Sequence, residues 1–164
     1  MNECHDCSNY AAPKPRILLI EDEHPYCELM VARLGDTYEV VCANMIAEGM
    51  SLLREKGPFD LVLLDLILPD SNLETSLPLF LKHFPNQPPI VISGYSEPNF
   101  VARMIRLGAR GYLIKGRDDL DTKTLLSRLN MIILHGRTTA QLSAAQIQLT
   151  KLGNELSRFS AEDI

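Results

Sequence analysis

Five short apolar runs, each followed by a segment whose apolar residues recur at helical spacing, dominate this 164-residue sequence. The first run, RILLI at Arg16–Ile20, is apolar without alternation, as in strands of a parallel sheet that helices cover on both faces. Strands alternating with helices indicate one parallel sheet, and right-handed crossovers bring the carboxyl ends of its strands to one edge. The pattern predicts strands at 16–20, 38–43, 59–64, 89–92 and 111–114.

The helices and the two ends of the chain complete the predicted organisation. Pro25 and Pro98 suit the first turn of a helix, and Ser76 is a candidate cap for the third helix. The last helix of the series is expected from about Leu120 to Leu134. The sequence is therefore divided into a flexible N-terminal tail at 1–14, an α/β domain at 15–135 and an amphipathic helical extension at 136–164.

The charge balance argues against nucleic-acid and membrane partners. Lys and Arg number 16 against 21 Asp and Glu, so the net charge of -5 offers no basic footprint for phosphate backbones. No apolar run approaches the roughly 18 residues of a membrane span. The N-terminal segment MNECHDCSNYAAPKP has neither the basic start nor the apolar core of a secretory signal. We therefore expect a cytoplasmic protein.

The cysteines do not indicate a metal site. Cys4 and Cys7 form a single CxxC pair, and no second pair with ligand spacing follows to complete the ligands of a zinc site. Cys27 and Cys42 lie inside apolar segments and are interpreted as small core residues. All four thiols are expected to be reduced in the cytosol.

Polar residues follow four of the predicted strands at the point where each strand ends. Glu21 and Asp22 follow the first strand, Asp65 the third, Ser93 the fourth and Lys115 the fifth. Because parallel strands end at the same edge, we expect these side chains to meet where ligands of such sheets bind. Three close carboxylates repel one another unless a cation intervenes, and Mg²⁺ is the hard cation that suits a site handling phosphate.

This set of residues can accept a phosphoryl group on an aspartate. The Asp65 carboxylate is already ionised, so it can attack phosphorus without a general base. A metal ion and Lys115 would neutralise phosphoryl oxygens, and Ser93 would donate a hydrogen bond to one of them. Taken alone, an Asp after a strand is more often a turn former or a helix cap. The joint occurrence at one sheet edge favours the functional interpretation.

The sequence resembles the receiver domain of bacterial two-component response regulators over approximately residues 15–135. The resemblance rests on ILLIEDE at 17–23, DLVLLDLILPD at 60–70, IVISG at 90–94 and GYLIKG at 111–116. The spacings of 43, 28 and 22 residues between Asp22, Asp65, Ser93 and Lys115 are similar to those of the family. The resemblance implies a doubly wound, five-stranded parallel sheet of the flavodoxin-like (βα)5 type, with strand order 2-1-3-4-5 and a C-terminal helical extension.

By position, the resemblance implies a role for each residue at the sheet edge. Asp65 is similar to the phosphoacceptor and Lys115 to the phosphate-binding lysine. Ser93 is similar to the switch hydroxyl and Tyr112 to the switch aromatic residue. The catalytic residues that it implies are Asp65, Ser93 and Lys115. The Mg²⁺ ligands that it implies are Glu21, Asp22, Asp65 and the backbone carbonyl of Ile67.

Three departures from the family pattern affect the expected behaviour. The loop at 66–75 reads LILPDSNLET, one residue short and without the usual glycine, which leaves the start of the third helix open. Gly116 replaces the usual proline after Lys115, so a cis peptide bond is not assured there. Ile67 and Tyr95 occupy the two positions that flank the path of the hydrolytic water in the family. Neither side chain can hold that water as an amide or a carboxylate would.

The expected function is a phosphorylation-dependent signalling switch. It would accept a phosphoryl group on Asp65 from a sensor histidine kinase or a phosphotransfer protein and act through a downstream protein partner or dimerisation. Beyond self-phosphorylation and slow autodephosphorylation, no enzyme activity is expected. The alternatives are an aspartyl-phosphate-type phosphatase, a binding-only receiver, and the front segment of a longer regulator. The phosphatase would need a second acid where the sequence has Ile67, and the complete acidic set argues against the binding-only receiver.

The extension at 136–164 carries apolar residues at positions spaced 3, 4, 3, 4 and 3 apart: Leu142, Ala145, Leu149, Leu152, Leu156 and Phe159. This seam is shorter than the roughly three to four heptads of a secure coiled-coil prediction, and Gly136 and Gly153 weaken it. Three interpretations stay open: a helix that continues from the domain and forms a homodimer, a helix that folds back onto the domain, and a frayed tail.

Overall fold

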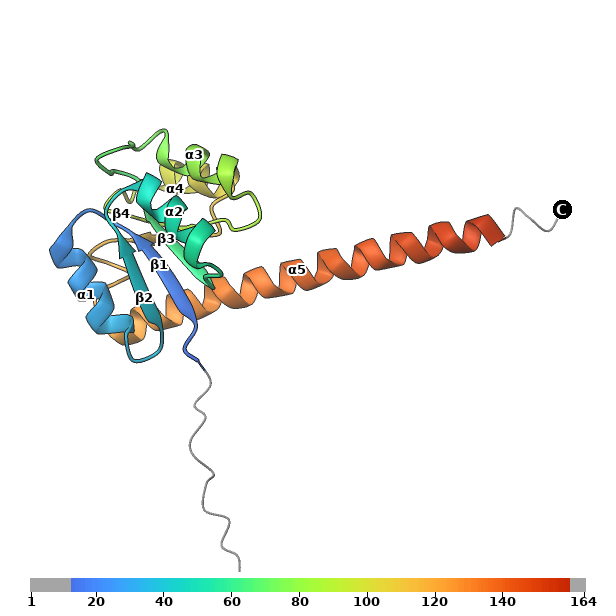
Figure 1. Ribbon diagram of the computed structural model, residues 1–164, viewed down its shortest axis with the longest axis horizontal. Coiled ribbons are helices and arrows are strands. Elements are labelled where there is room, and N and C mark those ends of the chain that lie inside the picture. The colour runs from blue at the N-terminus through green and yellow to red at the C-terminus, as the bar shows by residue number, and fades with distance from the viewer. Residues whose placement is uncertain (1–12, 160–164) are drawn as a thin grey trace, which may run out of the picture. The chain divides into compact units, whose positions relative to one another are not determined.

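The structure is a computed structural model that describes residues 13–159. Within these residues, five strands form one sheet in the order β2-β1-β3-β4-β5 (Figure 1). The strands are β1 (Arg16–Ile20), β2 (Glu39–Ala43), β3 (Leu61–Asp65), β4 (Ile90–Ser93) and β5 (Gly111–Ile114). The helices are α1 (His24–Leu34), α2 (Ile46–Lys56), α3 (Ser76–His83), α4 (Pro98–Leu107) and α5 (Thr122–Phe159). The chain forms two compact units, one that ends at Tyr112 and one that begins at Leu113.

The doubly wound parallel fold predicted from the sequence is confirmed. β1 pairs in parallel with both β2 and β3, and β3 pairs in parallel with β4. Every predicted strand is present within two residues of its expected bounds. The strand order places β1 beside β3, where the direction of winding reverses and where ligands of such sheets bind. The tail predicted at 1–14, with Cys4 and Cys7, lies almost wholly outside the described residues.

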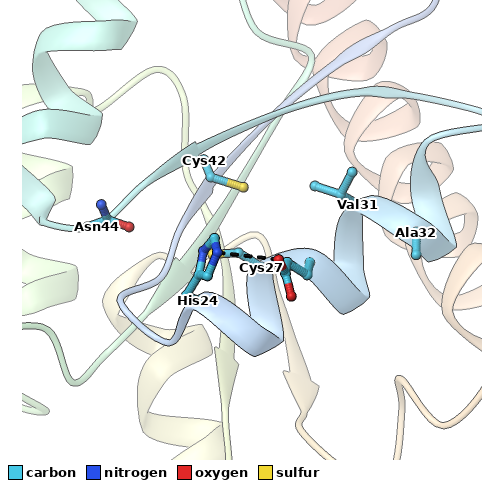
Figure 2. Close-up of a pocket in the computed structure, with 7 residues that line it drawn as sticks. His24, Cys27, Val31, Ala32, Cys42 and Asn44 are labelled. Carbon is cyan, nitrogen blue, oxygen red and sulfur yellow. Dashed lines mark ion pairs between the residues drawn. The ribbon is translucent and has the colours of Figure 1, made fainter.

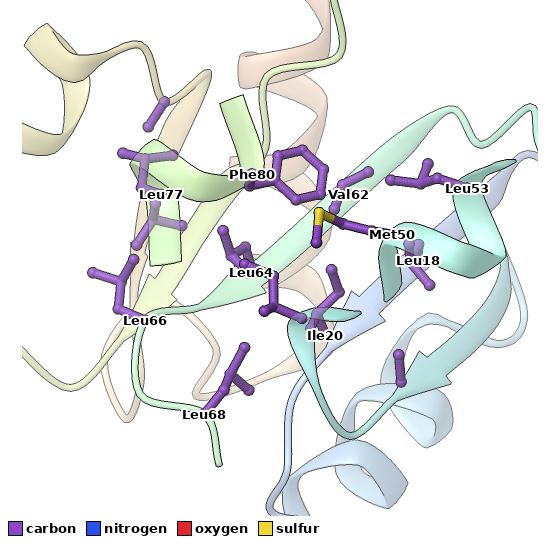
Figure 3. Packing of buried hydrophobic residues seen from close by; sticks show 14 of the residues in the cluster. Leu18, Ile20, Met50, Leu53, Val62, Leu64, Leu66, Leu68, Leu77 and Phe80 are labelled. Carbon is purple, nitrogen blue, oxygen red and sulfur yellow. The ribbon is translucent and has the colours of Figure 1, made fainter. Parts of the chain in front are cut away.

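A continuous apolar cluster joins one face of the sheet to α2 and α3 (Figure 3). Alternate residues of β1 and β3 contribute to this face, because successive side chains of a strand point to opposite sides. Apart from the half-buried Arg16, the remaining residues of both strands are also buried, which explains why their sequences are apolar without alternation. The cluster includes Leu18, Ile20, Val62, Leu64, Met50, Leu53, Leu77 and Phe80.

α1 and α2 cover opposite faces of the sheet, because the right-handed crossovers β1–α1–β2 and β2–α2–β3 run in opposite directions across it. The buried residues of α1 are Cys27, Met30 and Leu34, and none belongs to the cluster around α2. α2 approaches β1 closely at Gly49, where an added Cβ would lie 2.4 Å from Cδ1 of Ile20. A side chain at this position would push α2 away from the strand that ends at the acidic pair.

The loop between β3 and α3 caps a neighbouring helix. Met45 precedes α2, and its side chain makes no capping hydrogen bond. Instead, the carboxylate of Asp70 accepts hydrogen bonds from the backbone N–H groups of Ile46 and Ala47, each at 2.9 Å. A carboxylate at a helix N-terminus satisfies otherwise unpaired donors and interacts favourably with the helix dipole. Asp70 therefore anchors the loop that follows Asp65 to the start of α2.

The start of α3, which the sequence left open, is fixed by Ser76. We expected this residue to cap the helix, but Thr75 takes the cap position and Ser76 is the first helical residue. The Ser76 hydroxyl is buried and donates to the backbone carbonyl of Leu66 at 2.7 Å. It also hydrogen bonds to the hydroxyl of Ser71 at 2.7 Å. The first turn of α3 is thereby tied to the backbone that leaves β3.

α5 is one uninterrupted helix of 38 residues in the unit that begins at Leu113. The helix that we expected to end near Leu134 continues to Phe159, so the described backbone matches the interpretation of a continuing helix. Gly136 and Gly153 lie inside it, although each costs about 1 kcal/mol of helix stability relative to alanine. All side chains from 141 to 152 are exposed. Among the described helices, none is long and apolar enough to cross a membrane.

Candidate functional site

The strand register brings three carboxylates together at the ends of β1 and β3. Ile20, the last residue of β1, pairs with Leu64, so Glu21 follows at the level of Asp65. The N–H of Glu21 donates to a carbonyl of β2 at 2.8 Å, which extends the pairing of β1 by one residue. One carboxylate oxygen from each of Glu21, Asp22 and Asp65 lies within 4.8 Å of the others. The sequence prediction that these three side chains meet is confirmed.

Burial strengthens the repulsion among these three carboxylates, which a bound cation would relieve. Glu21 is 0% exposed and Asp65 is 6% exposed, whereas Asp22 is open to solvent. The Glu21 carboxylate accepts the N–H of Glu23 at 3.1 Å, and the Asp65 carboxylate accepts the N–H of Ile67 at 3.3 Å. Like charges this close repel one another, and burial removes the water that would screen them. A set of carboxylate oxygens is the donor set that Mg²⁺ prefers, so the cluster fits a hard divalent cation.

Ser93 lies next to Asp65 across the β3–β4 pairing. It is the last residue of β4 and is 2% exposed. Asp65 pairs with Ile92, so Ser93 is one residue beyond the level of the carboxylate. The Ser93 Oγ accepts a hydrogen bond from the backbone N–H of Tyr95 at 3.2 Å. A hydroxyl that accepts in this way can still donate its own hydrogen to an anionic oxygen.

Tyr112 lies close enough to Ser93 and Asp65 to respond to both. Burial raises the pKa of the Tyr112 phenol, a hydrogen bond with the Ser93 side chain opposes that rise, and the Asp65 charge adds to it. The phenol donates to the backbone carbonyl of Tyr95 at 2.8 Å. Its ring meets Phe100 edge-on at 6.4 Å between centroids, and Phe100 lies 5.5 Å from the ring of Tyr95. Three aromatic rings therefore connect the carboxylate edge to the first turn of α4.

The two side chains that were predicted to flank the path of water are both exposed. Ile67 is 53% exposed and Tyr95 is 48% exposed. Ile67 has no polar side-chain atom, and the ring of Tyr95 packs against Phe100. Neither side chain carries an amide or a carboxylate group.

Lys115 directly follows β5, in the unit that begins at Leu113. The peptide bond between Lys115 and Gly116 is trans; within residues 13–159 the cis peptide is at Gly57–Pro58. Gly116 has φ of 76°, a left-handed conformation that glycine adopts without steric cost. The role of Lys115 toward a phosphoryl group stays a prediction from the resemblance.

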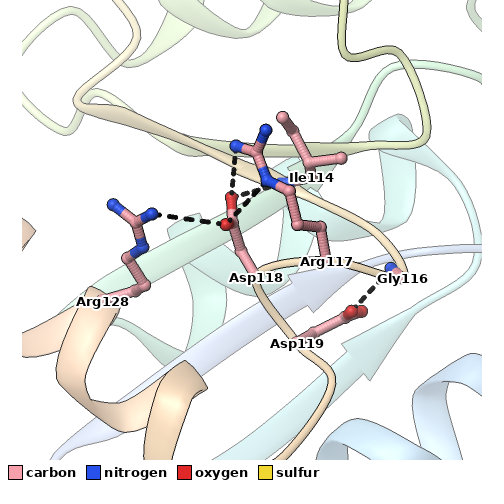
Figure 4. A network of polar contacts seen from close by, with 6 residues as sticks. All are labelled: Ile114, Gly116, Arg117, Asp118, Asp119 and Arg128. Atoms are coloured by element: carbon pink, nitrogen blue, oxygen red, sulfur yellow. Dashed lines mark hydrogen bonds and ion pairs between the residues drawn. The ribbon is translucent and has the colours of Figure 1, made fainter.

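Two buried aspartates in the loop after Lys115 were not identified from the sequence. Asp118 is 4% exposed and Asp119 is 3% exposed. Their carboxylates accept hydrogen bonds from the backbone N–H groups of Ile114, at the end of β5, and of Gly116 in the loop (Figure 4). Consecutive acidic residues shortly before a helix usually indicate a solvated turn or a cap, so only the observed burial distinguishes them.

A pocket of about 440 Å³ lies between α1 and β2 (Figure 2). Cys27 and Cys42 line it, and an ion pair of 3.3 Å joins His24 to Glu28 at its rim. The Cys27 thiol is buried and donates to the backbone carbonyl of Glu21 at 3.4 Å. Burial raises the pKa of the half-buried Cys42 thiol. The interpretation of Cys27 as a core residue is confirmed, whereas Cys42 is partly open to the pocket.

Comparison with known proteins identifies the family. The family model of the response regulator receiver domain matches residues 17–130, which is more than half of the chain. The chain belongs to the response regulator receiver family. The match covers all five strands, except for Arg16 at the start of β1, and the acidic cluster, so the receiver fold implied by the resemblance is confirmed.

Individual relatives agree with this receiver assignment. A putative NtrX-like response regulator of Rickettsia conorii is 28% identical over 86% of the chain, and the two-component response regulator ARR12 of Arabidopsis thaliana is 31% identical over 61%. The matched segments are 30% and 17% of those relatives' lengths, so the chain spans less than a third of either. The non-phosphorylated HemR receiver domain of Leptospira biflexa superposes with a TM-score of 0.62 and 35% identity, covering 73% of this chain and 94% of that domain.

Proposed function

We propose that this receiver accepts a phosphoryl group on Asp65 from a sensor histidine kinase or a phosphotransfer protein and then acts on a downstream protein partner in the cytoplasm. The cluster of Glu21, Asp22 and Asp65 within 4.8 Å of one another carries the proposal. A buried, ionised carboxylate beside two others is suited to attack phosphorus once a cation offsets their charge. The net charge of -5 argues against nucleic acid as the partner.

The transfer needs no general base. An oxygen of the ionised Asp65 carboxylate attacks phosphorus, a P–O bond to aspartate forms, and the bond from phosphorus to the donor breaks. Mg²⁺ held by Glu21, Asp22, Asp65 and the carbonyl of Ile67 supplies charge neutralisation when it is bound. The N–H of Ile67 fixes the orientation of the carboxylate through its bond of 3.3 Å to Asp65 Oδ1. Lys115 binds one phosphoryl oxygen, and Ser93 donates to another.

A switch fits the site better than a phosphatase of related chemistry. An aspartyl-phosphate phosphatase needs an acid to protonate the leaving group two residues after its nucleophile. That position is Ile67, which has no acid and is 53% exposed. The chain is therefore proposed to act as a signalling protein, with self-phosphorylation and slow loss of phosphate as its own chemistry. Incubation with acetyl phosphate and Mg²⁺ tests this, because the intact mass should increase by one phosphoryl group and a chelator should prevent the increase.

Phosphorylation is proposed to be transmitted by Ser93 and Tyr112. A phosphoryl group adds a charge of about -1.5 to -2 and three strong acceptor oxygens. Ser93 turns its hydroxyl toward the phosphoryl group. The hydrogen bond between the side chains of Ser93 and Tyr112 is then lost, and the ring of Tyr112 gains room to move. The Tyr112 phenol then releases the carbonyl of Tyr95, to which it donates at 2.8 Å. This alters the contacts of Phe100 at the start of α4 and biases an existing equilibrium between two arrangements.

We expect phosphorylation to change the amide chemical shifts of residues 95–105 as strongly as those of the loop at 66–75. The physical reason is the release of the hydrogen bond between Tyr112 and Tyr95. The measurement is a pair of ¹H–¹⁵N correlation spectra with and without acetyl phosphate. Tyr112→Phe, which lacks the donor, should already show part of the shift at Tyr95 without phosphate. Changes confined to 66–75 would contradict the switch.

The exposed half of α5 is proposed to pair with a second copy of the chain. Leu142, Leu149 and Leu152 are 65%, 69% and 55% exposed, and they recur with Ala145 at coiled-coil spacing along one side of the helix. Two identical helices would cover these leucines with each other, since the same seam is present on both. With about two and a half heptads, the pairing is short, so we expect a homodimer that dissociates on dilution.

Leu149→Ala is expected to convert this dimer to monomer at concentrations where the unchanged protein is mainly dimeric. The substitution removes a seam side chain, which in a helix pair contributes about 2–5 kcal/mol when buried. Ile147→Ala is the matched control, because Ile147 is 60% exposed but lies off the seam. Light scattering coupled to size exclusion over a dilution series measures both. Equal masses for the unchanged protein and Leu149→Ala, or equal loss with Ile147→Ala, would rule out this seam.

A further inference from the structure

The loop after β5 holds the peptide groups on both sides of Lys115. The carbonyl of Ile114, in the peptide group before Lys115, accepts the backbone N–H of Asp118 at 2.9 Å. The N–H of Gly116, in the peptide group after Lys115, donates to the carboxylate of Asp119 at 2.6 Å. Lys115 is therefore the residue between two peptide groups that hydrogen bonds hold in place, and Figure 4 shows the bond between Gly116 and Asp119.

Asp118 closes this loop through two hydrogen bonds with the backbone of Ile114. Its carboxylate accepts the N–H of Ile114 at 2.9 Å while its own N–H donates to the Ile114 carbonyl. Arg117 Nε lies 3.2 Å from the carboxylate, and Arg128 of α5 lies 3.6 Å from it. Burial acts to raise the pKa of Asp118, but the hydrogen bond from Ile114 and the two guanidinium groups hold it below its usual value. The carboxylate is therefore charged at neutral pH, which strengthens its bond to the backbone.

Asp119 holds the peptide group on the other side of Lys115 through the N–H of Gly116. Asp119 is 3% exposed, and its partner Gly116 has φ of 76°. A non-glycine residue would resist this left-handed conformation, which sets the direction of the N–H that Asp119 accepts. A buried carboxylate is costly unless hydrogen bonds compensate it. A simple connection between strand and helix requires no buried acid, and this loop has two in succession.

We infer that Asp118 and Asp119 are positioning residues that fix the backbone of Lys115 so that its ammonium group can bind the phosphoryl group. This inference rests on the proposed phosphorylation of Asp65. A lysine side chain is a flexible stem of four carbons, so a fixed origin reduces the conformational freedom that it loses on binding. Gly116 leaves the backbone free where the family usually has a proline. The two carboxylates restore the restriction that the proline would impose.

A double-mutant cycle on the rate of phosphorylation by acetyl phosphate tests the inference. The four proteins are the unchanged chain, Lys115→Ala, Asp119→Asn and the double variant, all as the full chain with Mg²⁺. We expect Asp119→Asn to slow labelling about tenfold, because it weakens one charge-assisted hydrogen bond. In the Lys115→Ala background the same change should have no further effect, since Asp119 acts through the lysine. Mg²⁺ affinity, measured by calorimetry, should be the same in the unchanged chain and in Asp119→Asn.

Each outcome separates the positioning role from a structural one. Equal slowing by Asp119→Asn in both backgrounds, or no slowing in either, would overturn the inference and leave the proposed function intact. If Lys115→Ala labels as fast as the unchanged chain, the proposed role of Lys115 itself fails. Asp118→Asn provides the same cycle on the other side of the lysine, so the comparison does not depend on the folding of one variant. Asp121→Asn is the matched control, because Asp121 caps α5 through Thr124 at 2.8 Å and should leave the rate unchanged.

Discussion

Asp65→Asn is expected to abolish phosphoryl labelling completely, which is the largest single effect that the site predicts. The asparagine keeps the size and the buried place of Asp65, which is 6% exposed, but its neutral amide oxygen is a poor nucleophile for phosphorus. The substitution also removes one of three carboxylates that lie within 4.8 Å of one another, so Mg²⁺ binding should weaken. Intact-mass spectra after incubation with acetyl phosphate and Mg²⁺ measure the outcome.

Two further variants make the Asp65 experiment specific. Asp36→Asn changes an exposed aspartate after α1 and should label like the unchanged chain. Asp22→Asn removes an exposed member of the acidic cluster and should label only at raised Mg²⁺ concentration, since it is a proposed ligand and not the acceptor. Labelling of Asp65→Asn equal to that of the unchanged chain would show that the acceptor lies elsewhere. Labelling that persists with a chelator would contradict the metal requirement.

The sheet and its acidic edge were predictable because they depend on short-range sequence patterns. An apolar run such as LVLL at 61–64 must be buried on both faces, and it forces the next polar residue, Asp65, to the strand end. Parallel topology then brings Glu21 to the same edge, because β1 and β3 are neighbours. Neither step requires knowledge of loops or helix ends.

The loops were less predictable because their side chains bind backbone groups far away in the sequence. Asp70 caps α2, whose first residue is Ile46, and nothing in the loop sequence indicates that partner. Ser76 was expected to cap α3, but its hydroxyl donates a hydrogen bond to the carbonyl of Leu66. In the sequence, a hydroxyl or carboxylate near a helix start looks the same whichever N–H or carbonyl group it binds. The contacts are decided by how the loop folds, which the local pattern does not contain.

The sequence left open whether the last helix continues through the extension, and it did not identify the buried aspartates of the preceding loop, for a related reason. Gly136 and Gly153 lower local helix propensity, so a frayed tail stayed open beside a continuing helix, but a long helix tolerates two such costs. Asp118 and Asp119 look like turn residues, because burial of a carboxylate is decided by neighbouring arginines and backbone donors. Propensity describes single positions, whereas both of these features arise from several residues acting together.

The phosphorylated protein is expected to lose its phosphoryl group slowly because water is poorly held near Asp65. Hydrolysis needs a water in line with the bond from phosphorus to the aspartyl oxygen. Ile67 has no polar side-chain atom for this water, and the Tyr95 ring, which packs on Phe100, stands at the second flanking position. The site therefore binds the phosphoryl group well, but its side chains at these two positions do little to hold the attacking water.

Ile67→Asn and Tyr95→Glu should each hasten dephosphorylation, and the double variant should do so most. One added hydrogen bond to the water contributes about 0.5–1.5 kcal/mol, which corresponds to roughly twofold to tenfold in rate for each substitution. Ile67→Leu and Tyr95→Phe are the matched controls, because they keep the apolar or aromatic bulk and should leave the rate unchanged. The decay of the phosphorylated mass after removal of acetyl phosphate is measured for the unchanged chain and all five variants. If the unchanged chain loses phosphate as fast as the double variant, placement of water does not limit hydrolysis, since the two positions then have no influence on the slow step.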